Sequence, residues 1–327
     1  MRMQCCCSRF LEKLMMKVYF LDTVHPILQE RLQASGYTCL DFTQQSRENC
    51  EEAIRDAHGL VIRSRFPMDE GFLRHAPDLK FIARSGAGME NIDVAYTQQR
   101  EITCYNAPEG NRNAVGEHAL GMLLSLMNHL NKGDREVRNG IWDREGNRGV
   151  ELDGKTIGII GYGNNGAAFA KKLRGFDVEI LAFDKYKAGF STDQVKESTL
   201  QEIFQRADVL SFHIPQNSET LYMGNAEFFA QFKKPIYLLN LSRGKIIRTT
   251  DLMKGVNEGR ILGAGLDVLE FESSSFENIF SGNIPLAFKE LLASDKVILS
   301  PHVGGWTVES YFKLSDVLAD KILGGIA

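Results

Sequence analysis

The segment SPHVGGW, Ser300–Trp306, places a histidine where an apolar strand should end. Pro301 cannot continue a ladder of backbone hydrogen bonds, so the strand before it must stop there. His302 is therefore predicted to stand at the exit of a strand, where Gly304 and Gly305 leave room for another group to approach. An imidazole exchanges protons near neutral pH, which makes His302 a candidate acid–base group. A histidine that only completes a turn would show the same pattern.

A second motif, GYGNNG at residues 161–166, follows an apolar strand and opens a helix-like stretch. Gly161 allows a tight turn, Gly163 lets the backbone approach a pyrophosphate, and Gly166 permits close packing of helix on strand. The amides at the start of that helix would bind an anion. Asp184, at the end of the next strand, would accept hydrogen bonds from ribose hydroxyls and repel a 2′-phosphate. The motif predicts a dinucleotide site that prefers NAD to NADP; a glycine-rich turn with an unrelated acid is the alternative.

Short β-rich runs alternate with amphipathic stretches along most of the chain, starting at residue 17. This alternation predicts βαβ units and parallel sheets, and hence an α/β fold. Two such series meet near residues 110–117. We expect the longest helix at 117–138 and a final helix at about 307–327, both with apolar residues at helical spacing.

Composition excludes several classes of function. The 327 residues are 43% hydrophobic and 24% charged, with a formal net charge of −4, so nothing attracts nucleic acid or an anionic membrane. Six cysteines show neither metal-ligand spacing nor a disulfide framework, and we expect no metal and a cytoplasmic location. Residues 1–16 contain three adjacent cysteines and no secretory signal. We expect them to form an extension outside the folded domains, with palmitoylation or metal binding as alternatives.

Seven segments together resemble the D-isomer-specific 2-hydroxyacid dehydrogenases, and among them the D-3-phosphoglycerate dehydrogenases. They occur in the family's order, and the resemblance covers the chain from about residue 17 to its end. They are RSGAGMENID (84–93), NAPEGN (106–111), GYGNNG (161–166), ADVLSFHIP (207–215), NLSRG (240–244), GLDVLEFE (265–272) and SPHVGGW (300–306).

The resemblance implies a Rossmann-type NAD-binding domain inserted into a flavodoxin-like substrate domain. Residues 17–114 and 301–327 would form the substrate domain, and 115–300 the NAD-binding domain. The region 117–150 resembles the element through which these enzymes form homodimers.

The family's catalytic set falls on Arg243, Glu272 and His302. His302 would exchange a proton with the substrate oxygen, Glu272 would orient the imidazole, and Arg243 would bind the substrate carboxylate. Arg243 could instead be a surface cation, and Glu272 one acid among several. Ser273 stands where the family often has proline, so the loop 273–288 has an uncertain course.

The resemblance also implies contacts with NAD and with the substrate carboxylate. The backbone amides of Ser85, Gly86 and Ala87, continuing to Gly88, would cradle the carboxylate. The expected cofactor-binding residues are Gly161, Gly163, Asn164, Asn165, Gly166, Asp184, His213, Pro215, Leu241, Asp267 and Gly305.

Three arginines suggest a phosphorylated substrate. Arg63 and Arg84 end apolar strands that would face the active-site cleft, and Arg144 would reach it from the partner subunit. Guanidinium groups match a phosphate well, whereas a lactate- or glycerate-type substrate would not need three cations. All three could instead be solvated surface groups. We therefore predict oxidation of 3-phosphoglycerate to 3-phosphohydroxypyruvate, a step of serine biosynthesis.

The same residues also fit other functions. A reductase of glycerate/hydroxypyruvate, of another D-2-hydroxyacid or of the phosphite type would use the same catalytic set. An NAD-sensing protein resembling the dehydrogenase-like corepressors could keep that set without turning over a substrate. A formate dehydrogenase is disfavoured, because that branch has glutamine where Glu272 stands.

Overall fold

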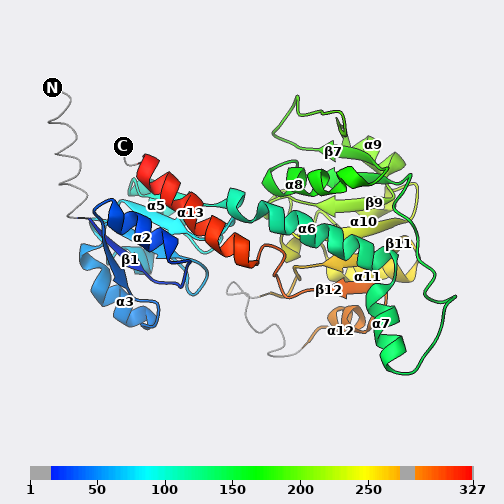
Figure 1. The fold of residues 1–327 in the computed structure, drawn as a ribbon, viewed down its shortest axis with the longest axis horizontal. Helices are drawn as coiled ribbons and strands as arrows, with labels where there is room; N and C mark the ends of the chain where they lie inside the picture. Colours follow the sequence, from blue (N-terminus) through cyan, green and yellow to red (C-terminus); the bar gives the residue numbers. More distant parts are fainter. Residues whose placement is uncertain (1–15, 273–283, 326–327) are drawn as a thin grey trace. The chain divides into compact units, whose positions relative to one another are not determined.

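The computed structural model describes residues 16–272 and 284–325, which divide into two compact units (Figure 1). Unit 1 contains the described residues up to Asn111 and from Trp306 onward, and unit 2 contains those from Arg112 to Gly305. The segment 301–305, expected with the substrate domain, is thus grouped with unit 2. The N-terminal extension and most of the loop 273–288 lie outside the described residues.

Unit 1 is built on a five-stranded parallel sheet with the order β2-β1-β3-β4-β5. This is the flavodoxin-like order, and it confirms the predicted fold. The strands are β1 (Lys17–Phe20), β2 (Thr38–Asp41), β3 (Gly59–Ile62), β4 (Phe81–Arg84) and β5 (Thr103–Asn106).

Helices cover both faces of this sheet. Leucines of α2 and α13 pack on one face against Val18, Val61 and Phe81. The other face packs against α3 and α4 through residues such as Cys50 and Phe72. These helices are α2 (Ile27–Ala34), α3 (Arg47–Ala53), α4 (Glu70–Leu73) and α13 (Val308–Gly325); α5 (Val94–Gln99) precedes β5.

Unit 2 is built on a seven-stranded parallel sheet with the order β12-β11-β10-β9-β6-β7-β8. Counted from β6, this is the doubly wound Rossmann order with one further strand, as predicted. The strands are β6 (Thr156–Ile160), β7 (Glu179–Phe183), β8 (Val195–Glu197), β9 (Val209–Phe212), β10 (Ile236–Asn240), β11 (Ile261–Leu266) and β12 (Val297–Leu299).

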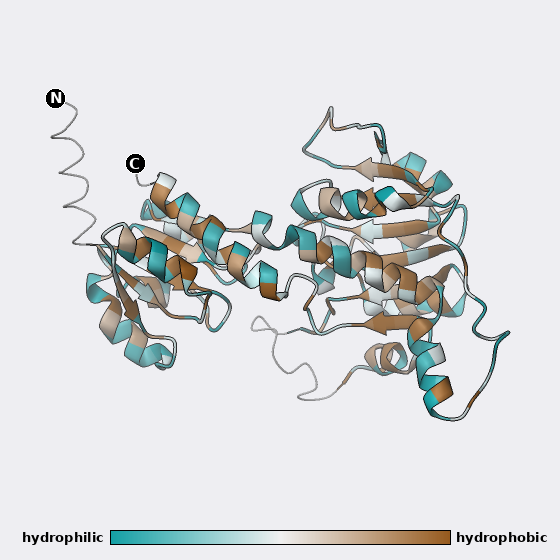
Figure 2. Cartoon of the chain, viewed as in Figure 1, coloured by the Kyte–Doolittle hydropathy of each residue, from teal (hydrophilic) through white to brown (hydrophobic). Residues whose placement is uncertain are grey.

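The sheet of unit 2 is also covered on both faces. α6 and α8 bury one face, and α9–α12 bury the other. Figure 2 shows the strands as largely hydrophobic, whereas α6, α8 and α13 alternate along their length. The helices are α6 (Pro108–Met127), α7 (Leu130–Arg138), α8 (Asn164–Lys172), α9 (Leu200–Arg206), α10 (Ala226–Ala230), α11 (Thr249–Asn257) and α12 (Leu286–Ala293).

The helix expected at 117–138 differs from the structure at both ends. α6 begins at Pro108, a residue suited to a first helical turn because its missing amide proton would have no partner there. It ends at Met127, and α7 follows after His129, whose φ of +52° breaks the helix. Periodicity alone detected the buried face but not this break.

In the described residues, no helix is long and apolar enough to span a membrane, and no group of three or more metal-ligating side chains is present.

Candidate active site

The turn between β6 and α8 requires its glycines. Gly161 has a φ of +92°, and a Cβ there would lie 2.4 Å from the carbonyl oxygen of His213. A Cβ on Gly166 would lie 2.0 Å from the carbonyl oxygen of Gly161, so α8 packs directly on the turn. A Cβ on Gly163 would meet nothing within 4 Å, which leaves the backbone at the start of α8 open to a ligand. This is the cradle that a pyrophosphate needs.

The first turn of α8 also contains an unused acceptor. Asn165 Oδ1 is buried and has no hydrogen-bond partner among the described residues. Arg112 Nη1 lies 3.4 Å from Asn164 Oδ1, which places a cation beside the helix start. The cation suits a phosphate group, and the unused acceptor suits a hydroxyl donor next to it.

A cavity of about 330 Å³ lies at the carboxyl ends of β6, β7 and β9, the usual ligand-binding edge of a parallel sheet. Asp184 lines it, and its carboxylate is held by the amides of Tyr162 at 2.8 Å and Tyr186 at 2.9 Å. Of the predicted cofactor residues, Gly161, Gly163, Asp184, His213 and Pro215 line this cavity, whereas Asn164, Asn165, Gly166, Leu241, Asp267 and Gly305 do not. The turn, the acid and the cavity fit a dinucleotide.

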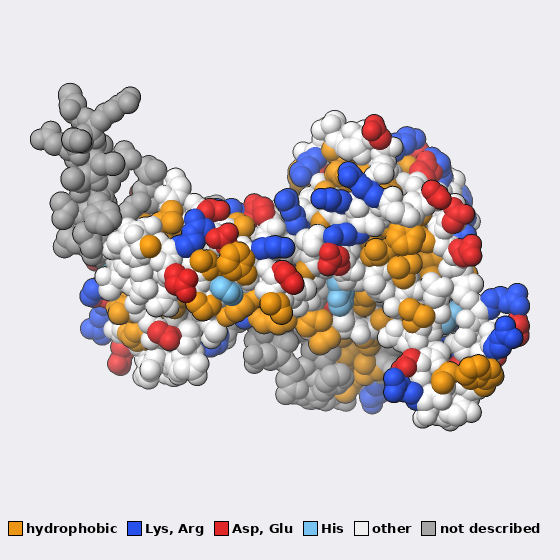
Figure 3. Space-filling model, viewed as in Figure 1, with side chains coloured by type: hydrophobic (Ala, Val, Ile, Leu, Met, Phe, Trp, Pro, Cys, Tyr) orange, Lys and Arg blue, Asp and Glu red, His pale blue; other side chains and the backbone are white. Residues whose placement is uncertain are grey.

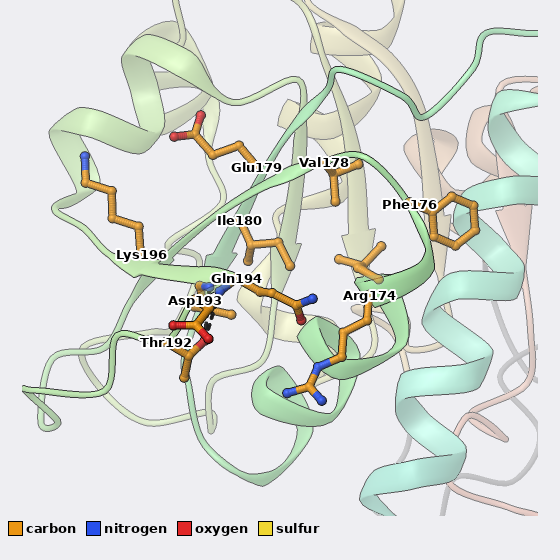
Figure 4. Close-up of a pocket in the computed structure, with 11 residues that line it drawn as sticks. Arg174, Phe176, Val178, Glu179, Ile180, Thr192, Asp193, Gln194 and Lys196 are labelled. Atoms are coloured by element: carbon orange, nitrogen blue, oxygen red, sulfur yellow. Dashed lines mark hydrogen bonds between the residues drawn. The ribbon is translucent and has the colours of Figure 1, made fainter.

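A second cavity in unit 2, of about 360 Å³, is shown in Figure 4. It is lined by Arg174, Thr192 and Gln194 and by the first residues of β7 and β8. Ligands bind at the carboxyl ends of parallel strands, so this cavity lies at the wrong edge for the reaction.

His213 lies on the rim of the dinucleotide cavity with its ring buried. Ser211 Oγ is 2.8 Å from its Nε2, and the Phe169 ring lies 5.6 Å from the imidazole, centroid to centroid. Burial lowers the pKa of His213 to about 4, so the imidazole is neutral at physiological pH.

His302 follows β12 and is paired with Glu272. Its Nδ1 lies 2.8 Å from Glu272 Oε2, and Glu272 Oε1 accepts a hydrogen bond from the Leu269 amide at 2.5 Å. The His302 backbone has a φ of +55°, a left-handed conformation that is uncommon outside glycine. A histidine held this way against a carboxylate is suited to exchanging a proton through its other ring nitrogen.

Asp267 holds the loop that carries His302. It is 2% exposed; Oδ1 accepts hydrogen bonds from Ser300 Oγ at 2.6 Å and the Val303 amide at 2.9 Å, and Oδ2 accepts one from the Gly304 amide at 2.8 Å. The sequence predicted Asp267 only as a cofactor contact. Its place at the end of β11, beside β12, was the signal that could have revealed this loop-holding role.

His118 was not predicted at all. Its Nε2 lies 2.9 Å from Ser300 Oγ and 3.6 Å from Asp267 Oδ1, so α6 contributes to the same network. His118 and Ser300 are 182 positions apart in the sequence, so no local pattern could have revealed the pair.

Arg243 lies in a turn that packs on the turn carrying Glu272. Asn240 Nδ2 donates to the carbonyl oxygen of Arg243 at 2.9 Å, which fixes the backbone after β10. A Cβ on Gly244 would lie 1.9 Å from the carbonyl oxygen of Leu269, the same residue whose amide binds Glu272. The glycine of the SRG motif therefore allows the close approach of these two segments.

In unit 1, the predicted carboxylate loop follows β4. The amide of Ser85 donates to the carbonyl oxygen of Ile62 at 2.8 Å, and that of Gly86 to Arg84 at 2.9 Å. Within the described residues, the amides of Ala87 and Gly88 have no hydrogen-bond partner. The cradle predicted for four amides is therefore reduced to two.

The three predicted substrate arginines are distributed over both units. Arg63 follows β3 and Arg84 ends β4, and these strands are neighbours in unit 1. A Cβ on Gly86 would lie 1.8 Å from Arg84 Nη1, so this guanidinium crosses the glycine backbone. Arg144 lies on an exposed segment of unit 2 after α7.

Comparisons with known proteins identify the family of this chain. Residues 120–304 match the family described as D-isomer specific 2-hydroxyacid dehydrogenase, NAD binding domain. The chain is 34% identical over 286 residues to a glyoxylate reductase of Pyrococcus furiosus, covering 85% of this chain and 82% of that protein. It is 29% identical over 310 residues to a D-3-phosphoglycerate dehydrogenase of Archaeoglobus fulgidus, covering 94% of this chain but only 57% of that protein.

A solved structure has a similar fold. It is the NADPH-dependent glyoxylate/hydroxypyruvate reductase of Sinorhizobium meliloti in complex with NADP and malonate. The similarity covers 95% of this chain and 93% of that one, with a TM-score of 0.76 and 26% identity. From the family match, these relatives and the dinucleotide site, we conclude that the chain belongs to the D-isomer-specific 2-hydroxyacid dehydrogenases and is an NAD-dependent oxidoreductase.

Proposed function

We propose that this enzyme oxidises 3-phosphoglycerate to 3-phosphohydroxypyruvate, with unit 2 as the NAD-binding domain and unit 1 as the substrate domain. The observation that carries this proposal is Arg63. Its side chain is partly buried at a strand end and forms no ion pair within the described residues. An unpaired, half-buried guanidinium is suited to an anionic group of the substrate.

His302 and Glu272 would handle the proton. Because His302 Nδ1 faces Glu272, Nε2 is the nitrogen that would accept the proton of the C2 hydroxyl during oxidation. Glu272 stabilises the resulting imidazolium and fixes the orientation of the ring. NAD, when bound, supplies the hydride acceptor for C2. In the reverse direction His302 returns the proton to the carbonyl oxygen.

Arg243 and the amides of Ala87 and Gly88 would hold the C1 carboxylate. A guanidinium presents a fork of donors that matches a carboxylate, and two neighbouring amides add a fixed partial positive charge. A carboxylate bound by such donors would orient C2, and the guanidinium of Arg243 would polarise the oxygen on C2. The remaining anionic group of the substrate would be left for Arg63 and Arg84.

Reduction of glyoxylate or hydroxypyruvate is the second candidate. The Pyrococcus furiosus relative, a glyoxylate reductase, is more similar in sequence than the Archaeoglobus fulgidus phosphoglycerate dehydrogenase and matches over most of its own length. A glyoxylate-type substrate would need the same proton and carboxylate groups but would leave Arg63 without a function.

Steady-state kinetics with NADH separate the candidates. We expect a higher kcat/KM for 3-phosphohydroxypyruvate than for hydroxypyruvate or glyoxylate, and a selective rise in KM for the phosphorylated substrate in Arg63→Ala. Equal efficiency with glyoxylate would reject the phosphate assignment. A protein that binds NADH but reduces no 2-keto acid would favour a role as an NAD-sensing binding protein.

We further propose a homodimer formed through the region 117–150, with Arg144 acting in the site of the partner subunit. The segment from α7 onward exposes the apolar side chains of Leu130, Val137, Ile141, Trp142 and Val150. Figure 3 shows orange side chains on the exposed surface of the chain. Trp142 is 78% exposed, which is costly for a side chain without a partner. A cytoplasmic location is part of the same proposal. Sedimentation of a Trp142→Arg variant as a monomer, and of the parent as a dimer, would support this interface.

A further inference from the structure

Trp306 lies at the start of α13 with its indole against Arg63. The guanidinium carbon of Arg63 is 3.9 Å from the ring centroid, and the indole is 50% exposed. Thr307 and Ser310 cap the helix reciprocally: the Thr307 amide donates to Ser310 Oγ at 2.8 Å and the Ser310 amide to Thr307 Oγ1 at 3.0 Å. Tyr311 packs beside the indole, 6.2 Å between ring centroids. Trp306 thus directly precedes a capped helix start, and its indole lies between Arg63 and Tyr311.

Arg63 is fixed on its backbone side as well. Its amide donates to Asp22 Oδ2 at 2.5 Å, and its carbonyl oxygen accepts from Asn91 Nδ2 at 3.0 Å. Burial lowers the pKa of the guanidinium, partly offset by the charges of Asp22 and Tyr311. The carboxylate of Asp22 accepts a hydrogen bond from the Arg63 backbone amide and not from its guanidinium. The guanidinium is instead held by the face of the Trp306 ring.

Other arginines near aromatic rings in unit 1 are used differently. Arg47 lies 5.3 Å from the Phe72 ring but pairs with Glu51 and Asp69. Arg100 lies 5.8 Å from the Tyr96 ring and donates to three main-chain carbonyls. Arg63 is closer to its ring than either and, among the described residues, has no such acceptor. A guanidinium that binds a ring through its face keeps the N–H groups at its edge available for an anion.

We propose that Trp306 is a positioning residue that holds Arg63 for a second anionic group of the substrate, the group on C3. This inference rests on the proposed function. The amide loop after β4 starts beside the end of β3, so the stacked pair and the carboxylate cradle lie at neighbouring strand ends of unit 1. One end of the substrate would be held by amides and the other by the stacked cation. Phosphate and carboxylate share this chemistry, and the experiment distinguishes them.

The test compares three 2-keto acids that differ at C3: 3-phosphohydroxypyruvate, oxaloacetate and the neutral hydroxypyruvate. NADH oxidation is followed for the parent, Trp306→Leu and Trp306→Phe. Loss of a cation–aromatic contact should raise KM in Trp306→Leu by roughly 3- to 30-fold for the anionic C3 group that Arg63 binds. The KM for hydroxypyruvate and the three kcat values should stay within about twofold of the parent. Phenylalanine at 306 should restore most of the lost affinity.

Tyr96→Leu is the matched control, because it removes another arginine–aromatic contact from unit 1 while Arg100 keeps its carbonyl partners. It should leave all three KM values near those of the parent. Trp306→Leu overturns the inference if it raises KM equally for hydroxypyruvate, or changes no KM.

A different result is expected if the proposed function is wrong. The parent enzyme could prefer oxaloacetate to 3-phosphohydroxypyruvate, and Trp306→Leu could raise KM only for oxaloacetate. This result would reject the phosphate assignment but support the role of Trp306 in positioning Arg63. A parent enzyme that favours neither anionic substrate over hydroxypyruvate would overturn both.

Discussion

Burial of the His213 imidazole should make the free energy of unfolding depend on pH. Its pKa is lowered by burial to about 4, whereas a histidine in an unfolded chain titrates near 6.5. Between these values the folded chain keeps His213 neutral and the unfolded chain binds a proton. The stabilisation is therefore complete above about pH 6.5 and is lost as the pH falls toward 4.

The size of this effect follows from the two pKa values. The full difference corresponds to about 3 kcal/mol, of which about 1.4 kcal/mol is already lost at about pH 5.5. Glutamine at position 213 does not titrate, and its amide can still reach Ser211 Oγ, which lies 2.8 Å from the imidazole Nε2. Between about pH 8 and 5.5, His213→Gln should therefore lose about 1.4 kcal/mol less stability than the parent.

Urea unfolding at the two pH values, followed by circular dichroism, measures this difference. Ser211→Ala is the matched control, since it removes the hydrogen bond but leaves the imidazole buried. It should keep the pH dependence of the parent. If His213→Gln kept the pH dependence of the parent, burial of His213 would not be its cause. The imidazole would then be hydrated in the folded protein.

Three further predictions test the site and its scaffold. Asp184→Ala should narrow the preference for NADH over NADPH, measured by fluorescence titration, and a parent without that preference would contradict the role of the acid. His302→Ala should lower kcat by roughly 10²–10⁴-fold while NADH binding stays intact, and unchanged turnover would reject the proton-transfer role. Gly244→Ala should cost about 1–3 kcal/mol in urea unfolding, because its Cβ would lie 1.9 Å from the Leu269 carbonyl oxygen. Gly175→Ala, where a Cβ meets nothing within 4 Å, is its control, and equal losses in the two variants would contradict the steric argument.

The sequence predicted features that depend on local pattern. Alternating apolar runs predicted two parallel α/β units, and the glycines of 161–166 predicted the turn into α8. His302 was expected at a strand exit because proline ends a ladder, and β12 does end at Leu299. Each of these features is determined by residues close together in the chain, so the spacing of residue types was sufficient to predict it.

Neither an isolated left-handed residue nor a contact between distant segments was predictable in this way. The break between α6 and α7 depends on a left-handed backbone at His129, and histidine, although enriched in that conformation, adopts it in only a small fraction of cases. The loss of the Ser85 amide from the carboxylate cradle depends on Ile62, which lies in β3, whereas Ser85 follows β4. A single sequence without the fold gives no distance between such residues.

The segment GLDVLEFE shows how two nearby acids acquire different tasks. Asp267 directly follows β11, and its two carboxylate oxygens accept hydrogen bonds from the loop 300–304. Glu272 lies beyond the turn and faces the imidazole. The left-handed backbone of His302 costs of order 1 kcal/mol, so something must hold it, and the His302 amide donates to the carbonyl oxygen of Asp267 at 2.8 Å. In the proposed mechanism, Asp267 thus fixes where the imidazole is, and Glu272 fixes which of its nitrogens exchanges the proton.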